Sequence, residues 1–216
     1  LAPKDMKAIP ANTTVVAELL PNGLVDIAID PQDATHFFIA AWAQGLYEFR
    51  NKIFYKLYNA DNPIIESDMK EKYPERGFYN YTRVGAVAFD ANGIVWFAND
   101  YATNVMKYIT PQGVVGNYDV GFGTLSTQKI LVSNQNTNQK WVLVSRDDQG
   151  SSCLFVFDDG GTLTTTADDK KRKFAFFVDQ DGKVLTPNFT WTMTQDHDGA
   201  IWIGTSSGLI VANNPE

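Results

Sequence analysis

The chain is poor in the residues that most often carry catalysis and metal binding. Its 216 residues include one cysteine and two histidines. A single cysteine cannot form an internal disulfide, and Cys153 lies in the apolar run CLFVF, which favours a buried hydrophobic role. His36 and His197 lie beside turn residues, and their spacing suggests no nucleophile–base pair. We therefore expect a protein that is not an enzyme and that needs no metal and no cofactor.

Long apolar runs and positively charged stretches are also scarce. No run of about 18 apolar residues exists, so the sequence predicts no membrane-spanning segment. The formal net charge is -7, which argues against a nucleic acid partner because phosphates would be repelled. The one dense basic run, residues 170–173 (KKRK), follows two aspartates and is predicted to be a solvated loop.

Helical periodicity is missing too. Only residues 67–76 could form a helical turn or two, and Pro74 limits even that segment. Aromatic residues make up 13% of the chain, and Val, Ile and Thr are abundant, which favours strands. The sequence therefore predicts an all-β protein.

What the chain does contain is an internal repeat. Each unit has the pattern strand, tight turn, strand, short loop, strand. The turns at residues 91–93 (ANG) and 196–199 (DHDG) are typical of hairpins, because glycine accepts the positive φ that they need. A fourth strand is predicted from KIFYKLYN in the first unit, VVGNYDV in the second and FAFFV in the third. The repeated cores are residues 23–50, 84–110, 129–159 and 190–214.

Four antiparallel strands, repeated every 45 to 60 residues or so, predict the blades of a β-propeller. We expect a single propeller region over residues 1–216, with three full blades and a partial one, forming an arc of a larger ring. Residues 13–20 are expected to be the outer strand of a neighbouring blade. The predicted blades are residues 23–59, 84–120, 129–186 and 190–214.

A β-sandwich or a β-barrel is the alternative all-β fold. A sandwich predicts strands without a fixed four-strand unit, whereas here a large ring recurs on the second strand. Trp96 and Trp202 follow the same short turn, and Trp141 lies in the equivalent strand of the third unit. We expect these tryptophans to be buried between blades, as structural residues rather than ligand platforms.

Two acidic turn motifs share closely spaced carboxylates with calcium-binding loops. Residues 179–182 (DQDG) and 196–199 (DHDG) carry closely spaced carboxylates, which hard cations prefer. Both lack the third acidic position and the downstream glutamate of an EF-hand. A hairpin turn is the better interpretation, and no metal site is predicted.

The candidate binding residues lie in loops that a propeller gathers on one face. Aromatic faces mixed with amide and charged groups suit a sugar, and clustered aromatic residues also suit a protein partner. The loops between second and third strands supply the predicted ligand-binding residues Trp42, Gln44, Asn99, Asp100, Tyr101, Arg146, Asp147, Ser206 and Ser207. The long insertion at residues 59–83 supplies the predicted partner-binding residues Tyr73, Phe78, Tyr79 and Tyr81, and other inter-blade loops add Phe122 and Phe189.

The last repeat resembles the two-component-regulator propeller repeat. That family repeats the pattern Asp-x-x-Gly-x-(Ile/Leu)-Trp-(Ile/Val)-Gly-Thr, followed by Gly-Leu. The second unit keeps Asp90, Gly93, Trp96 and Phe97, but has alanine and asparagine where Gly-Thr is expected. The matching positions of the last unit are Asp196, Gly199, Ile201, Trp202, Ile203, Gly204, Thr205, Gly208 and Leu209.

Residues 59–64 and 160–169 are similar to PorZ-like propeller proteins of the type IX (Por) secretion system of Bacteroidetes. This resemblance implies a location in the periplasm or at the cell surface, outside the inner membrane. It implies binding of surface polysaccharide or lipopolysaccharide, or of a secretion-system partner. The wider repeat family implies instead the periplasmic glycan-sensing propeller of a hybrid two-component histidine kinase. Neither implies catalytic residues.

Overall fold

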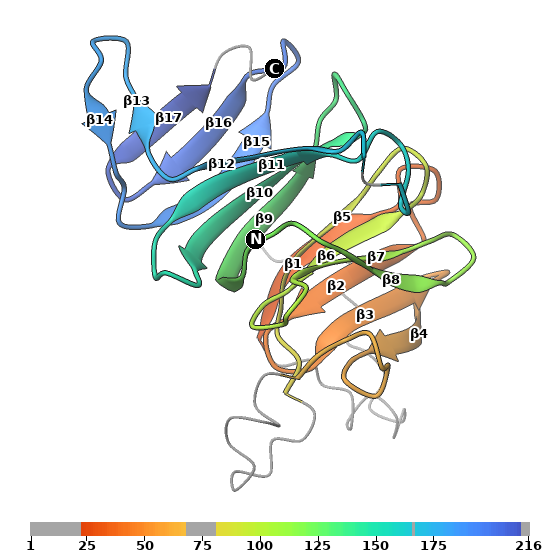
Figure 1. Cartoon of the computed structure of the whole chain (residues 1–216). Helices are drawn as coiled ribbons and strands as arrows, with labels where there is room; N and C mark the ends of the chain where they lie inside the picture. Colours follow the sequence, from red (N-terminus) through yellow and green to blue (C-terminus); the bar gives the residue numbers. More distant parts are fainter. Residues whose placement is uncertain (1–22, 68–80, 166, 213–216) are drawn as a thin grey trace, which may run out of the picture.

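The chain forms an arc of β-sheets that fan out like the blades of a propeller (Figure 1). The computed structural model describes residues 23–67, 81–165 and 167–212. These residues form only strands, turns and loops, so none of them belongs to a helix that could cross a membrane. The predicted all-β propeller arc is confirmed. The proposed outer strand at residues 13–20 lies outside the described residues.

Blades 1, 2 and 3 each contain four antiparallel strands that pair in chain order. Blade 1 consists of β1 (Leu24–Ile29), β2 (Phe37–Ala41), β3 (Gly45–Arg50) and β4 (Ile53–Tyr58). Blade 2 consists of β5 (Val84–Phe89), β6 (Val95–Asn99), β7 (Met106–Ile109) and β8 (Val115–Tyr118). Blade 3 consists of β9 (Thr124–Val132), β10 (Gln139–Asp147), β11 (Cys153–Asp158) and β12 (Lys170–Phe174).

Blade 4 has three described strands, β15 (Thr190–Gln195), β16 (Ile201–Thr205) and β17 (Gly208–Ala212). A small hairpin of β13 (Phe177–Val178) and β14 (Val184–Leu185) connects blades 3 and 4. The first strands β1, β5, β9 and β15 contact one another in sequence, so they form the inner side of the arc.

The fourth strand of blade 3 differs from the prediction. The basic run was expected to be a loop, and FAFFV was expected to be the strand. Instead Lys170–Phe174 forms β12, and Phe177 belongs to the separate hairpin. Lysine is a weak strand former in isolation, but it is common on edge strands. Here Lys173 donates a 2.7 Å hydrogen bond from Nζ to Asp147 Oδ2, which fastens the strand to β10.

The Asp, Gly and Trp positions of the repeat form one structural unit. In blade 2 the Asp90 carboxylate accepts hydrogen bonds from two turn amides at 2.9 and 3.0 Å and from Trp96 Nε1 at 2.9 Å. Gly93 closes that turn with φ of 74°. In blade 4 Asp196 repeats this pattern, and Trp202 Nε1 donates to it at 2.7 Å. The aspartate thus joins each turn to the ring on the following strand.

The two equivalent tryptophans differ in burial. Trp96 is 0% exposed, and its ring lies 5.4 Å from that of Phe157 in blade 3. Trp202 is 37% exposed, so the expectation that this ring is buried was wrong. Both rings lie on the same face of their blades. Blade 3 covers that face of blade 2, whereas no described blade covers that face of blade 4.

The outer faces at both ends of the arc are apolar and exposed. On blade 1, Ile27 and Ile29 of β1 are exposed, and on blade 4, Trp202 and Leu209 are exposed. The faces between blades are by contrast closely packed with buried side chains. Exposed patches of this kind are typical of surfaces that pack against another element.

Candidate functional site

The loops at one face of the arc surround a hollow of about 730 Å³, which we call the mouth site. Blade 2 contributes Arg83 and Tyr101, and blade 3 contributes both its first strand and its β10–β11 turn. The segment before β15 completes the wall. The lining residues are Arg83, Tyr101, Leu125, Ser126, Ser145, Arg146, Gly150, Asn188 and Phe189.

Arg83 is the centre of the charged part of the mouth site. Its Cζ lies 4.4 Å from the ring centroid of Trp42 and 5.5 Å from that of Tyr101. A guanidinium over aromatic faces is held by a cation–π interaction. Its Nε also lies 3.7 Å from Asp100 Oδ2, and the side chain is 17% exposed. The arginine is therefore fixed in place while part of it still faces solvent.

Asp100 has a structural role beneath Arg83. Its carboxylate is buried and accepts hydrogen bonds from Thr124 Oγ1 at 2.6 Å and from Thr127 Oγ1 at 2.7 Å. Burial raises the pKa of Asp100, and these hydrogen bonds together with Arg83 oppose the rise. The predicted ligand-binding residue Asp100 thus positions Arg83 and does not line the mouth site.

Tyr101 has a backbone conformation that is unusual for its side chain. Its φ is 67°, in the left-handed region, and its amide donates a 2.8 Å hydrogen bond to the carbonyl of Thr124. A non-glycine residue held there costs about 1–3 kcal/mol. Such strain is often found at functional sites, and here it accompanies a ring that lines the mouth site.

Arg146 and Phe189 form the opposite wall. Arg146 is exposed and forms no ion pair with any residue that the structure describes. Phe189 is 51% exposed, and its backbone exchanges hydrogen bonds with Ser206, from Ser206 N to Phe189 O at 2.9 Å and from Phe189 N to Ser206 Oγ at 3.2 Å. Ser206, a predicted ligand-binding residue, therefore holds the loop that carries Phe189.

Two buried nitrogen atoms of the stacked Arg83 and Trp42 side chains have no hydrogen-bond partner in the described part of the chain. They are Trp42 Nε1 and Arg83 Nε. A buried donor without a partner costs about 1–3 kcal/mol, so such groups usually bind a water molecule or a ligand. Of this stacked pair, Arg83 lines the mouth site, whereas the predicted ligand-binding residue Trp42 is not among its lining residues.

Two other predicted ligand-binding residues are used within the fold. Gln44 Oε1 accepts a 2.7 Å hydrogen bond from the hydroxyl of Tyr47. Asn99 is buried, and its Oδ1 accepts a 2.8 Å hydrogen bond from the amide of Glu66. Asn99 therefore fastens the segment after blade 1 to blade 2 and does not face the mouth site.

Asp147 and Ser207 also lie outside the lining. Asp147 is buried, where it accepts hydrogen bonds from Lys173 and from the amide of Ser151 at 2.8 Å. The Ser207 amide donates to Thr205 Oγ1 at 3.1 Å. Both residues stabilise turns, as short polar residues commonly do.

The structure places few of the predicted partner-binding residues. Tyr73, Phe78 and Tyr79 lie outside the described residues. Tyr81 is half-buried, and its carbonyl accepts a 2.8 Å hydrogen bond from Ser67 Oγ. Phe122 packs against Phe155 with ring centroids 4.4 Å apart, so it supports the core.

Sequence reasoning missed Arg83, the residue that connects the two predicted aromatic residues. It is the last residue of the insertion, and a single arginine there carries no motif. Its contacts with Trp42 and Tyr101 depend on how two blades pack, which the local sequence does not encode. Ser126, Ser145 and Asn188 were missed for the same reason.

A separate polar cluster lies at the β1–β2 turn. The His36 ring bridges Asp30 Oδ2 at 2.9 Å and Glu48 Oε1 at 3.1 Å. Glu48 is buried and also accepts hydrogen bonds from Arg50 Nε at 2.6 Å and the Tyr58 hydroxyl at 2.8 Å. Within the described ranges, no group of three or more His, Cys, Asp or Glu side chains is placed to hold a metal ion.

A family model described as "Two component regulator propeller" matches residues 184–207. A search of curated proteins by sequence found no match. Among solved structures, the chain is similar to PorZ, described as an essential surface component of the type-IX secretion system of Porphyromonas gingivalis. The identity is 25% and the TM-score 0.76, over 89% of this chain and 25% of that chain.

Two other similar structures show the fold alone. One is the extracellular domain of a protein assigned as a hybrid two-component system of B. thetaiotaomicron, with 15% identity, a TM-score of 0.54, and coverage of 89% and 23% of the two chains. Another, assigned as a gluconolactonase, has 11% identity and a TM-score of 0.53, with coverage of 86% and 58%. A domain of a two-component system and a protein assigned as an enzyme thus share this fold, so function must be argued from the site.

The chain spans about a quarter of the length of the PorZ structure. The family match falls on the repeat that contains Asp196, Gly199 and Trp202, the residues that carried the sequence resemblance. The predicted resemblance is therefore confirmed: the chain carries a two-component-regulator propeller repeat, and its blades are arranged like those of PorZ.

Proposed function

We propose that this chain is a non-catalytic binding arc of a cell-envelope propeller and that its mouth site binds surface polysaccharide or lipopolysaccharide. The observation that carries the proposal is the stack of Arg83 on Trp42 and Tyr101 beside a hollow that Arg83, Tyr101 and Arg146 line. The site presents two guanidinium groups beside aromatic rings, a combination that suits a sugar with acidic substituents.

The lining supplies each contact that such a glycan needs. The exposed ring of Phe189 and the ring of Tyr101 can pack against the apolar C–H faces of a sugar. Arg146 and Arg83 can bind a carboxylate or phosphate group, since a guanidinium pairs with these groups through two parallel hydrogen bonds. Ser126, a hydroxyl donor and acceptor, also lines the site.

The similarity to PorZ supports a place outside the inner membrane, in the periplasm or at the cell surface. The PorZ structure is described as a bacterial surface component of a secretion system. By the same likeness, a protein of that system is the second kind of partner we propose for this face. The exposed aromatic ring at Phe189 would serve either partner.

A periplasmic glycan sensor of a hybrid two-component histidine kinase is the second candidate. The match of the regulator propeller model to residues 184–207 favours it. In that case the mouth site would bind a glycan fragment rather than a surface polymer. Inhibition of polymer binding by short oligosaccharides at equal mass concentration would favour the sensor over the surface receptor.

The test is binding of the chain to immobilised lipopolysaccharide from Porphyromonas gingivalis by surface plasmon resonance. We expect Arg146→Gln to weaken binding about tenfold or more, since a hydrogen bond to a charged group contributes about 1.5–3 kcal/mol. Tyr101→Gly removes the ring and relieves the positive φ, so it should weaken binding while leaving the free energy of unfolding nearly unchanged.

Lys183→Gln is the matched control, because it removes the same charge from the exposed β13–β14 turn. It should bind like the original chain. Equal binding by Arg146→Gln, Tyr101→Gly and the control would remove the mouth site as the glycan site, and absence of binding by the original chain would refute this ligand.

A further inference from the structure

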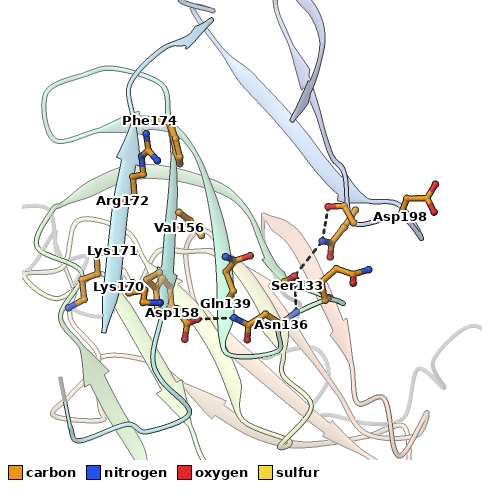
Figure 2. Close-up of a pocket in the computed structure, with 14 residues that line it drawn as sticks. Ser133, Asn136, Gln139, Val156, Asp158, Lys170, Lys171, Arg172, Phe174 and Asp198 are labelled. Carbon is orange, nitrogen blue, oxygen red and sulfur yellow. Dashed lines mark hydrogen bonds between the residues drawn. The ribbon is translucent and has the colours of Figure 1, made fainter. Parts of the chain in front are cut away.

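A second hollow, distinct from the mouth site, lies between blades 3 and 4 (Figure 2). We call it the blade 3–4 groove, and its volume is about 660 Å³. It opens near the β9–β10 and β15–β16 turns, whereas the mouth site lies near the β10–β11 turn. The lining residues are Ser133, Gln135, Asn136, Gln139, Val156, Phe157, Asp158, Lys170, Lys171, Arg172, Phe174, Gln195, Asp198 and Gly199.

The strand register of β12 determines which side chains face the groove. Asp158 pairs with Lys170, and Val156 pairs with Arg172. Side chains directly opposite each other in an antiparallel pair lie on the same face. Lys170, Arg172 and Phe174 therefore share the face of blade 3 that looks toward blade 4, as the sticks in Figure 2 show.

Blade 4 covers only the inner part of that face. Trp141 and Leu143 of β10 are buried against Met193 and Ile203 of blade 4. The side chains of β12 lie further out, and Lys170 and Arg172 remain exposed. Blade 4 has three described strands, whereas blade 3 has four, so β12 has no fourth strand of blade 4 as a counterpart in the described residues.

Hydrogen bonds between blades fix the end of the groove. The Asn134 amide donates to Gln195 Oε1 at 2.7 Å, and Asn134 Nδ2 donates to the carbonyl of Asp196 at 2.9 Å. Gln195 Nε2 also donates to Ser133 Oγ at 3.4 Å. These contacts join the β9–β10 turn to the β15–β16 turn, so the groove is preformed.

The cations on the groove side lack acidic partners. On the other face of β12, Lys171 and Lys173 pair with Asp169 at 3.6 Å and Asp147 at 2.7 Å. No ion pair to a described residue involves Lys170 or Arg172. The groove therefore presents two available positive charges in a chain whose net charge is -7.

The acidic side chain nearest these cations is already engaged. Asp158 Oδ2 accepts a 2.8 Å hydrogen bond from Asn136 Nδ2, drawn as a dashed line in Figure 2, and Oδ1 accepts one from the Gly160 amide at 2.9 Å. The Arg172 guanidinium lies 4.6 Å from the ring centroid of Phe174. Its charge is therefore held by a ring rather than neutralised by a carboxylate.

The edge of β12 supplies a second kind of contact. This strand pairs only with β11 in the described residues, so its outer edge offers unpaired backbone groups. Alternate side chains of a strand are separated by roughly 6.8 Å, so an added strand would place every second side chain opposite Lys170, Arg172 and Phe174 in turn.

We propose that the blade 3–4 groove binds an acidic, extended peptide segment of a partner protein, added as a strand to the edge of β12. Two acidic side chains at alternate positions lie opposite Lys170 and Arg172, and an apolar side chain lies opposite Phe174. Opposite charges across a strand pair are stabilising, and the added backbone completes the hydrogen bonds of the edge.

An extended peptide fits the groove better than a glycan does. Two rings line the groove: Phe157 is buried, and Phe174 is half-buried and covered by Arg172, so neither offers much free face for a sugar. Lysines on an edge strand normally discourage pairing with other chains. An acidic partner neutralises Lys170 and Arg172 and removes that obstacle, which also gives the site its selectivity.

The test is fluorescence anisotropy of the full 216-residue chain with the labelled peptide TTETETFTT and with its neutral counterpart TTQTQTFTT. We expect the acidic peptide to bind and the neutral one to bind at least about tenfold more weakly. The double variant Lys170→Gln, Arg172→Gln should weaken binding of the acidic peptide by about the same factor, because each exposed ion pair contributes up to about fivefold. Hydrogen exchange should show new protection of β12 amides when the peptide binds.

Lys183→Gln is the control for loss of charge and should retain full affinity. The proposal is overturned if both peptides bind equally, if the double variant binds the acidic peptide as the original chain does, or if β12 gains no protection. It is also overturned if polygalacturonate binds and is lost in the double variant while the acidic peptide fails to bind, since the groove would then be an acidic-glycan site.

Discussion

Trp96 and Trp202 occupy equivalent positions in the repeat, yet their surroundings imply different contributions to the free energy of unfolding. Each donates its Nε1 hydrogen bond to the aspartate of the preceding turn. The ring of Trp96 is enclosed by Tyr118 and Phe157, whereas the outer face of Trp202 has no described neighbour. The local motif is therefore the same, and only the packing around it differs.

We predict that Trp96→Ala lowers the free energy of unfolding by about 3–5 kcal/mol, because it leaves a large cavity between blades 2 and 3. Trp202→Ala should lower it by about 1–2 kcal/mol, since that ring is only partly buried. Urea unfolding followed by tryptophan fluorescence and circular dichroism measures both values. Equal losses for the two variants would show that another surface covers Trp202.

At the same scale, the mouth site shows what a sequence can and cannot reveal. Tyr101 and Arg146 were predicted from their loop positions, and both line the mouth site. Asp100 and Asn99 were predicted by the same argument but are buried, because they bond to residues distant in the sequence. Asp100 accepts from Thr124 and Thr127, and Asn99 accepts from Glu66. Loop position alone does not separate these two outcomes.

Strand β12 illustrates the limits of prediction for a whole element. The hairpins of blades 1, 2 and 4 follow from alternating apolar residues and glycine-containing turns, which are local signals. A run of lysine and arginine contains no such signal. It becomes a strand because β11 offers a free edge and because Lys171 and Lys173 pair with Asp169 and Asp147. Both are tertiary effects.

The link between β12 and β10 should make stability depend on acid pH. Burial acts to raise the pKa of Asp147, but the hydrogen bonds from Lys173 and from turn amides outweigh it and hold the pKa below its ordinary value of 3.8. A lowered carboxyl pKa stabilises the fold above the ordinary value, and this contribution is lost as pH falls through the folded-state pKa.

We predict that Lys173→Met lowers the free energy of unfolding at neutral pH by about 1–3 kcal/mol, because a buried carboxylate loses its charged partner. Because the variant lacks the partner that lowers the pKa of Asp147, its stability should fall less steeply than that of the original chain as pH drops below about 4. Urea unfolding at a series of pH values measures this, with Lys183→Met as control. Parallel pH profiles for the two variants would contradict the role of the pair.

At the scale of the whole molecule, the two end faces of the arc determine how the chain associates with other surfaces. The exposed apolar side chains of blade 1 include Ile27 and Ile29, and those of blade 4 include Trp202 and Leu209. Such patches are rare on soluble monomers and drive association with other surfaces. They lie at opposite ends of the arc (Figure 1).

We predict that the 216-residue chain binds a hydrophobic dye under native conditions and associates as its concentration rises. Ile27→Lys combined with Leu209→Lys should reduce dye fluorescence and association together while leaving the circular dichroism spectrum unchanged, because both side chains are exposed. Analytical ultracentrifugation measures the association. A chain that stays monomeric and binds no dye would show that these faces are covered.

The pairing of strands in chain order has a consequence for synthesis on the ribosome. Every blade pairs only consecutive strands, and each blade packs against its neighbours in sequence. Strand pairing is therefore confined to neighbours in the sequence, so a blade can form soon after its residues emerge. The newest blade presents an uncovered apolar face until the next one is complete. Translation pauses just after residue 120 or residue 174 would prolong that exposure, and chaperone binding to nascent chains should peak there.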